Sequence, residues 1–172
     1  MPNIPSGVTM FKVYDATATQ LLGLAKIKTP DINMKTATAS GAGLSGDVEF
    51  VFRGQTEAME MTMDFYSQLG AAQKLATPEW HTLTIKSAED ETDGATAKII
   101  INKVKYVVVV MPKKLSGAEI AAASMPNVSG TYSVRRFEKH INGKMVTCVD
   151  PINNSYVVDG VDYLADVLAA VN

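Results

Sequence analysis

A strict alternation of apolar and polar side chains constrains this fold more than any other feature of the sequence. The clearest apolar positions are Met59, Met61, Met63 and Phe65. Glu60, Thr62 and Asp64 separate them, as expected for a strand with one buried face, because successive side chains of a strand point to opposite sides. Leu83 and Ile85 repeat the pattern. We therefore expect a mainly β protein of antiparallel strands, forming one domain over residues 1–172.

Other strands are expected from composition and from breaks in the pattern. The shorter ones cover about residues 10–16, 21–27 and 32–38, and an Ile- and Val-rich one covers Lys98–Met111. The second half of the long strand, Tyr106–Met111, is apolar on both faces. Such a strand must be covered on both sides, by its own core or by another subunit. We therefore take Tyr106, Val108 and Val110 as candidates for an inter-subunit sheet.

Asn142-Gly143 is the strongest turn signal and predicts a two-residue hairpin between 131–141 and 144–150. The predicted pairs are Ile141 with Lys144, Lys139 with Val146 and Phe137 with Cys148. In this register Tyr132 and Val134 fall on the polar face. Either a bulge near Arg135-Arg136 switches the phase, or these two side chains meet a partner, which makes them further inter-subunit candidates.

Helices are expected to be few and short. Local signals favour a helix within Ser67–Ala76 and another at 116–124, where Ser116 and Glu119 fit a capping box. A C-terminal helix is expected over Val161–Val171, since Leu164 and Leu168 share one helical face.

Sites of chemistry are not expected, and we predict no catalytic, cofactor-binding or metal-binding residues. The G-x-G-x-x-G match at 41–46 precedes an alternating strand instead of the helix that a dinucleotide site needs. Cys148 is the only cysteine, and the predicted hairpin register puts it on the opposite face from His140. The net charge is −2 and the basic residues look scattered, so no face that grips phosphates is expected.

Three segments together resemble the major tail tube protein of contractile-tailed bacteriophages and of R-type, phage-tail-like bacteriocins. They are the glycine segment 40–46 between two strands, the hairpin 132–150, and the ending from Val149-Asp150-Pro151-Ile152-Asn153 to Leu164. Asp159-Gly160 stands where the family has Asn-Gly. The resemblance runs from about Phe11 to the end of the chain.

The resemblance implies an antiparallel β-sandwich or barrel with a flanking short helix and a C-terminal helix. It also implies hexameric rings, joined edge to edge, that stack into a tube inside a contractile sheath. The expected partners are further copies of the chain and the sheath, baseplate or tube-initiator and terminator proteins. DNA or ions would pass along the channel without specific binding, so a gel shift at physiological salt is expected to show none.

A long hairpin at about 39–55 is the expected stacking arm between rings. Its candidate residues are Gly41, Gly43, Leu44, Gly46, Val48, Phe50 and Phe52. Alternation puts Val48, Phe50 and Phe52 on one side, and three large apolar side chains on a glycine-rich hairpin need a surface to cover them. We expect this arm to be disordered in the free subunit and ordered in the tube.

Two other functions remain open at this stage. A monomeric β-barrel that binds a small ligand or a peptide would explain the strands but not the strand that is apolar on both faces. An enzyme would require a converging set of nucleophile, base or metal ligands, which the sequence does not provide. Because residues 1–7 lack the basic and apolar regions of a signal peptide, we expect assembly in the bacterial host cytoplasm into a virion tail or bacteriocin particle.

Overall fold

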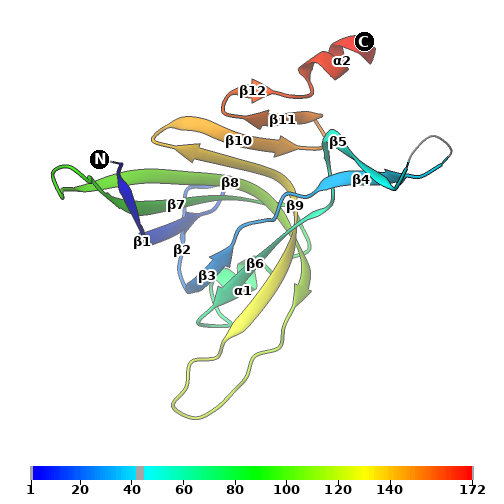
Figure 1. Cartoon of the computed structure of the whole chain (residues 1–172). Helices are drawn as coiled ribbons and strands as arrows, with labels where there is room; N and C mark the ends of the chain where they lie inside the picture. Colours follow the sequence, from blue (N-terminus) through cyan, green and yellow to red (C-terminus); the bar gives the residue numbers. More distant parts are fainter. Residues whose placement is uncertain (1, 42–44, 172) are drawn as a thin grey trace.

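The protein is a mainly antiparallel β structure (Figure 1). The computed structural model describes residues 2–41 and 45–171. The strands are β1 (Ile4–Tyr14), β2 (Gln20–Leu21), β3 (Leu24–Lys28), β4 (Met34–Ala39), β5 (Val48–Thr56), β6 (Met59–Phe65), β7 (His81–Thr92), β8 (Ile99–Leu115), β9 (Val128–Ile141), β10 (Lys144–Asp150), β11 (Ser155–Val158) and β12 (Val161–Asp162). The helices are α1 (Ala71–Lys74) and α2 (Ala165–Val171). The fold class and both helices implied by the resemblance are therefore confirmed.

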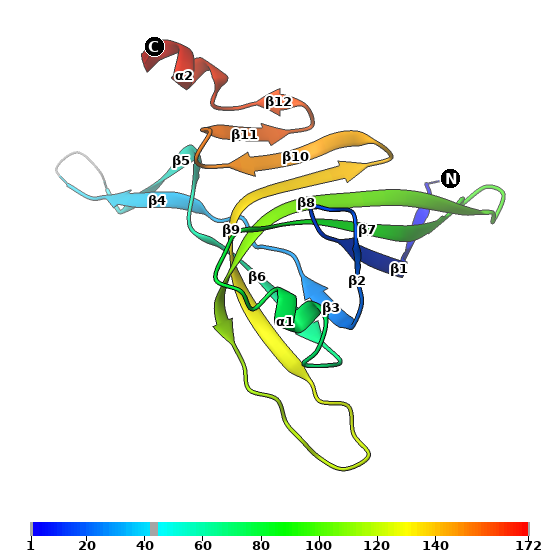
Figure 2. The ribbon, with the colours of Figure 1, turned by 180° about the vertical axis from the view of Figure 1, so that it is seen from behind.

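Most strands belong to one branched sheet in the order β12-β11-β10-β9-β8-β7-β1-β2, while β6 pairs with β9 and β3 pairs with β6. The branch lies at β9, which pairs with β8 along one edge. On its other edge, the first half of β9 pairs with β6 and the second half pairs with β10. This branching wraps the sheet around a core. The hairpin of β4 and β5 forms a separate two-stranded sheet that projects from the body (Figures 1 and 2).

The core lies between the long strands and β6, as the alternation predicts. Met59, Met61, Met63 and Phe65 all face inward and are at most 2% exposed. Ala71, Ala72 and Leu75 bring α1 into the same core, and Figure 2 shows this helix beside β3 and β6. One face of the long sheet is therefore covered by β3, β6 and α1.

The predicted hairpin turn is confirmed, but its register is only partly correct. Asn142 and Gly143 have φ values of 49° and 87°, and Lys144 pairs with Ile141. A register shift between Met145 and Thr147 then moves every later pair by one residue, so that Phe137 pairs with Val149 instead of Cys148. A bulge reverses which side chains face the core, and alternation on one strand gives no sign of it.

The bulge expected near Arg135-Arg136 is confirmed. Val109 pairs with Arg136 and the next residue, Val110, pairs with Val134, so Arg135 has no opposite residue on β8. The phase switch turns Val134 into the core.

Two other local predictions differ from the structure. Residues 116–127 contain no helix, because the capping box at Ser116 is followed by only a short apolar stretch before Pro126. The C-terminal helix begins at Ala165 instead of Val161, because Val161 belongs to β12 and pairs with Val158 of β11. Neither helix in the described part of the chain is long and apolar enough to cross a membrane.

Candidate assembly surfaces

The arm is longer than predicted and includes the strand expected at 32–38. Strand β4 pairs with β5 from Met34 opposite Thr56 to Ala39 opposite Val48. The two strands of the hairpin therefore cover residues 34–39 and 48–56, and they make no sheet pairing with the rest of the described chain. Figure 1 shows it extending away from the long strands.

The arm exposes the apolar side chains that the sequence singled out. Phe50 is 54% exposed and Phe52 is 50% exposed, and Val48 and Val51 are exposed as well. Gly41 and Gly46 lie between β4 and β5, whereas Gly43 and Leu44 lie outside the described residues. Burying one phenylalanine contributes roughly 1.5–3 kcal/mol, so this surface would gain substantially from a covering partner.

Two contacts join the base of the arm to the C-terminal segment. The guanidinium of Arg53 donates a 2.8 Å hydrogen bond to the Asp166 carboxylate, which lowers the pKa of Asp166 below its ordinary value. Gly54 has a φ of 72°, and a Cβ there would lie 2.6 Å from Leu164 Cδ2. Only glycine fits this bend, because Leu164 occupies the space of a side chain.

The residues chosen for an inter-subunit sheet are instead part of the subunit core, and that prediction needs correction. Val108, Val110, Tyr132 and Val134 are at most 5% exposed, and Tyr106 packs against the same core. Most of β8 and most of β9 also have neighbouring strands on both sides. The apolar run is thus covered by the subunit itself, the other explanation that its pattern left open.

Unpaired strand edges lie elsewhere, where β1, β7 and β8 extend beyond the rest of the sheet. Strand β1 pairs with β2 only at Val13 and Tyr14, so Ile4–Lys12 is hydrogen-bonded to β7 alone among the described strands. On the other margin, β8 pairs with β9 only from Val104 onward, so Ile99–Asn102 is also bonded to β7 alone. The three-stranded extension therefore has an open edge on each side.

Exposed apolar side chains follow both open edges. They are Ile4, Val8 and Met10 on β1 and Ile99, Ile100 and Ile101 on β8. Long apolar edges promote pairing with another chain. The Ile-Ile-Ile run indicates a strand at the start of β8. The start of β1 could not be predicted, because the proline and glycine of Pro5-Ser6-Gly7 are not typical of a strand. There the register against β7 is irregular.

The outer face of β9 and β10 carries a charged cluster around Cys148. Because of the register shift, Cys148 pairs with Glu138 and shares a face with His140, so the sequence-based argument that separated them was wrong. Glu138 forms an ion pair with Arg136, and its carboxylate lies 3.1 Å from His140 Nε2 in a hydrogen bond. Burial raises the pKa of the Cys148 thiol, with Glu138 adding to the effect, so the thiol stays neutral and is a poor nucleophile.

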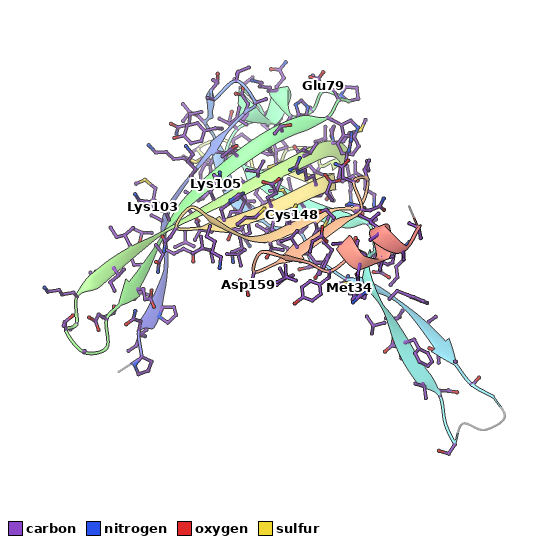
Figure 3. All side chains as sticks on the ribbon, turned by 90° about the horizontal axis from the view of Figure 1, so that it is seen from above. Met34, Glu79, Lys103, Lys105, Cys148 and Asp159 are labelled. Carbon is purple, nitrogen blue, oxygen red and sulfur yellow. The ribbon has the colours of Figure 1, made fainter. Side chains whose placement is uncertain are left out.

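A basic face is also present, contrary to expectation. In the sheet register Lys12 lies opposite Lys86, Lys86 opposite Lys105, and Lys105 opposite His140. Lys103 follows on the same face of β8, beside Lys105 (Figure 3). The low net charge of the chain therefore hides a local concentration of positive charge.

No group of three or more His, Cys, Asp or Glu side chains in the described part of the chain is arranged to hold a metal ion.

Comparison with known families decides the class of protein. The family model for phage tail tube protein FII matches residues 5–171. The chain belongs to this family. It is thus a structural tail tube protein, as the sequence resemblance indicated. No curated protein sequence matches it significantly.

Solved structures independently support the fold of this tube protein. One neighbour is from the sheath–tube complex of an extracellular contractile injection system (PVC) in the extended state. It is 15% identical, with a TM-score of 0.52 over 76% of this chain and 87% of the other. A second is from the sheath/tube terminator of the same kind of system, with 15% identity, a TM-score of 0.55 and coverage of 79% and 96%. The third is the tube-terminating cap of the anti-feeding prophage, with 18% identity, a TM-score of 0.53 and coverage of 81% and 91%.

Proposed function

We propose that six copies of this tube protein close into a ring and that rings stack into the inner tube of a contractile tail or tail-like bacteriocin. The observation that carries the proposal is the pair of open apolar edges on β1 and β8. They are different surfaces at opposite margins of one subunit, so pairing one edge with the other on the next copy is a head-to-tail contact. Repeated with the right rotation, such a contact closes a ring.

The arm would supply the contact along the tube axis. Its exposed apolar residues have no surface to cover in the described subunit, and a neighbouring ring would provide one. The tube would then serve as a conduit for DNA or ions, surrounded by a sheath protein and ended by baseplate and terminator proteins. The particle is a virion tail or bacteriocin assembled in the bacterial host cytoplasm.

The ring contact is tested by placing a charge on each open edge with Val8→Lys and Ile101→Lys. Val8 is 58% exposed and Ile101 is 62% exposed, so the subunit should fold normally, with a change in unfolding free energy below about 0.5 kcal/mol. A desolvated lysine within a joined sheet should abolish rings. Negative-stain microscopy and light scattering at rising concentration measure the outcome.

The matched control changes two exposed apolar residues in loops, Leu22→Lys and Ile120→Lys. It adds the same charge but leaves both edges intact, and it should form rings like the wild type. Rings formed by the edge variant would refute this contact. A wild-type chain that stays monomeric at every concentration would favour the alternative, a β-barrel binding module.

A further inference from the structure

The basic face is a row of like charges on adjacent strands. Lys12, Lys86 and Lys105 occupy directly opposed positions on β1, β7 and β8. Opposed side chains on neighbouring strands lie roughly 5 Å apart at Cβ, where like charges destabilise the sheet. The arrangement is therefore unfavourable for the isolated subunit and becomes favourable when an anion lies across it.

Nearby acids do not neutralise this row. Within the described residues, no ion pair involves Lys12, Lys86, Lys103 or Lys105. Two acids share this face without contacting the four lysines: Asp90 accepts a 2.6 Å hydrogen bond from the Thr9 hydroxyl, and Glu138 forms its ion pair with Arg136. Lys86 lies 4.8 Å from the centre of the Tyr14 ring, an interaction that leaves its charge in place.

The row lies in a hollow of the sheet. A trough of about 390 Å³ is lined by all four lysines, together with Met10, Tyr14 and His140. The trough crosses β1, β7 and β8 and extends to the β9–β10 hairpin at Gly143. An extended anionic chain lying in it could approach several ammonium groups at once.

The position of this face in a tube follows from the ring, and this step rests on the proposed function. The opposite face of the same strands is covered by β3, β6 and α1. When sheets are joined edge to edge into a closed barrel, one face points inward, and the bulky layer fits only on the outside. The lysine face therefore lines the channel, repeated once per subunit.

We propose that this face binds the phosphodiester backbone of a nucleic acid strand, independently of sequence. All of its permanent cations are lysines, whose compact charges on flexible stems attract phosphate without fixing its orientation. Phosphate contacts of this kind carry no sequence information, which suits a strand that moves along a channel. The same row raises the concentration of the polyanion in the channel while each single contact stays weak.

The test measures binding of a fluorescent single-stranded oligonucleotide to the full chain by anisotropy at several salt concentrations. The variant K12Q/K86Q/K105Q removes the row, and K26Q/K35Q/K114Q removes three exposed lysines from other surfaces as a charge-matched control. Neutralising three phosphate contacts should reduce the slope of log K against log salt by about 2. The control should keep the wild-type slope.

Absence of binding by the wild type at low salt, or an unchanged slope in the row variant, would overturn the proposal. Poly-L-glutamate that competes as strongly as the oligonucleotide would overturn the assignment to nucleic acid and point to an acidic polypeptide. Microscopy of the same samples separates this result from the ring. Binding that depends on the lysine row, without any tubes, would support the anion site and refute its place in a tube channel. Tubes without such binding would support the tube and refute the anion site.

Discussion

Replacing both Phe50 and Phe52 with serine should give a folded subunit that no longer forms tubes. Both side chains are about half exposed, so little of their burial belongs to the subunit itself. If a neighbouring ring covers these side chains, each substitution removes roughly 1.5–3 kcal/mol of apolar burial between rings. Every subunit of a ring contributes the same loss. Circular dichroism reports the fold, and negative-stain microscopy at high concentration reports the tubes.

The control for this experiment removes exposed apolar surface away from the arm. Tyr66→Ser with Leu69→Ser changes two exposed side chains beside α1 and should leave tube formation intact. Normal polymerisation of the arm variant would show that the arm is not the stacking element. Failure to fold would instead show that Phe50 and Phe52 belong to the subunit core.

Alternation predicted which strands exist and which side chains of each strand are buried, because both depend on local sequence. It succeeded at Met59–Phe65, where every predicted core residue is buried. It failed where one extra residue enters a strand, as at Val146, since the resulting shift depends on pairing with another strand. The bulge at Arg135 was foreseen only because two large apolar residues conflicted with the phase of the hairpin.

The assembly surfaces were harder to predict, because an open edge is defined by strands that are missing beside it. Tyr106–Met111 is apolar on both faces, yet β7 and β9 flank most of it. The basic face was invisible for a related reason. Lys12, Lys86 and Lys105 are far apart in the sequence, and only the registers of β1, β7 and β8 place them in one row.

Tyr132 combines a fully buried ring with a hydroxyl that lacks a partner. The side chain is 0% exposed, and its ring lies where a Cβ on Gly130 would be, 2.6 Å from Cε2. No polar atom of the described residues accepts or donates a hydrogen bond to its Oη. Burial raises the pKa of Tyr132 to about 12. The ring should therefore stabilise the fold strongly, whereas the hydroxyl should not.

Tyr132→Ala should lower the free energy of unfolding by about 3–5 kcal/mol, as expected for a lost aromatic ring in a packed core. Tyr132→Phe should be neutral or stabilising by up to about 1 kcal/mol, because it removes a buried polar group without leaving a cavity. Urea unfolding at neutral pH separates these outcomes, and Tyr66→Phe on the surface is the control. A loss above about 2 kcal/mol in Tyr132→Phe would show that the hydroxyl has a partner.

The same pair of proteins should differ in alkaline solution. With the folded pKa of Tyr132 near 12 and the unfolded value near 10, the unfolded chain releases this proton first as the pH rises. The protonated phenol therefore contributes its full stabilisation below pH 10, and the wild type loses that contribution progressively as the pH rises toward 12. Tyr132→Phe has no phenol and lacks this contribution. Two pKa units correspond to about 3 kcal/mol, so the stability of the wild type relative to Tyr132→Phe should fall by up to that amount. A difference that stays constant from pH 8 to about 11.5 would show that the phenol titrates equally in both states.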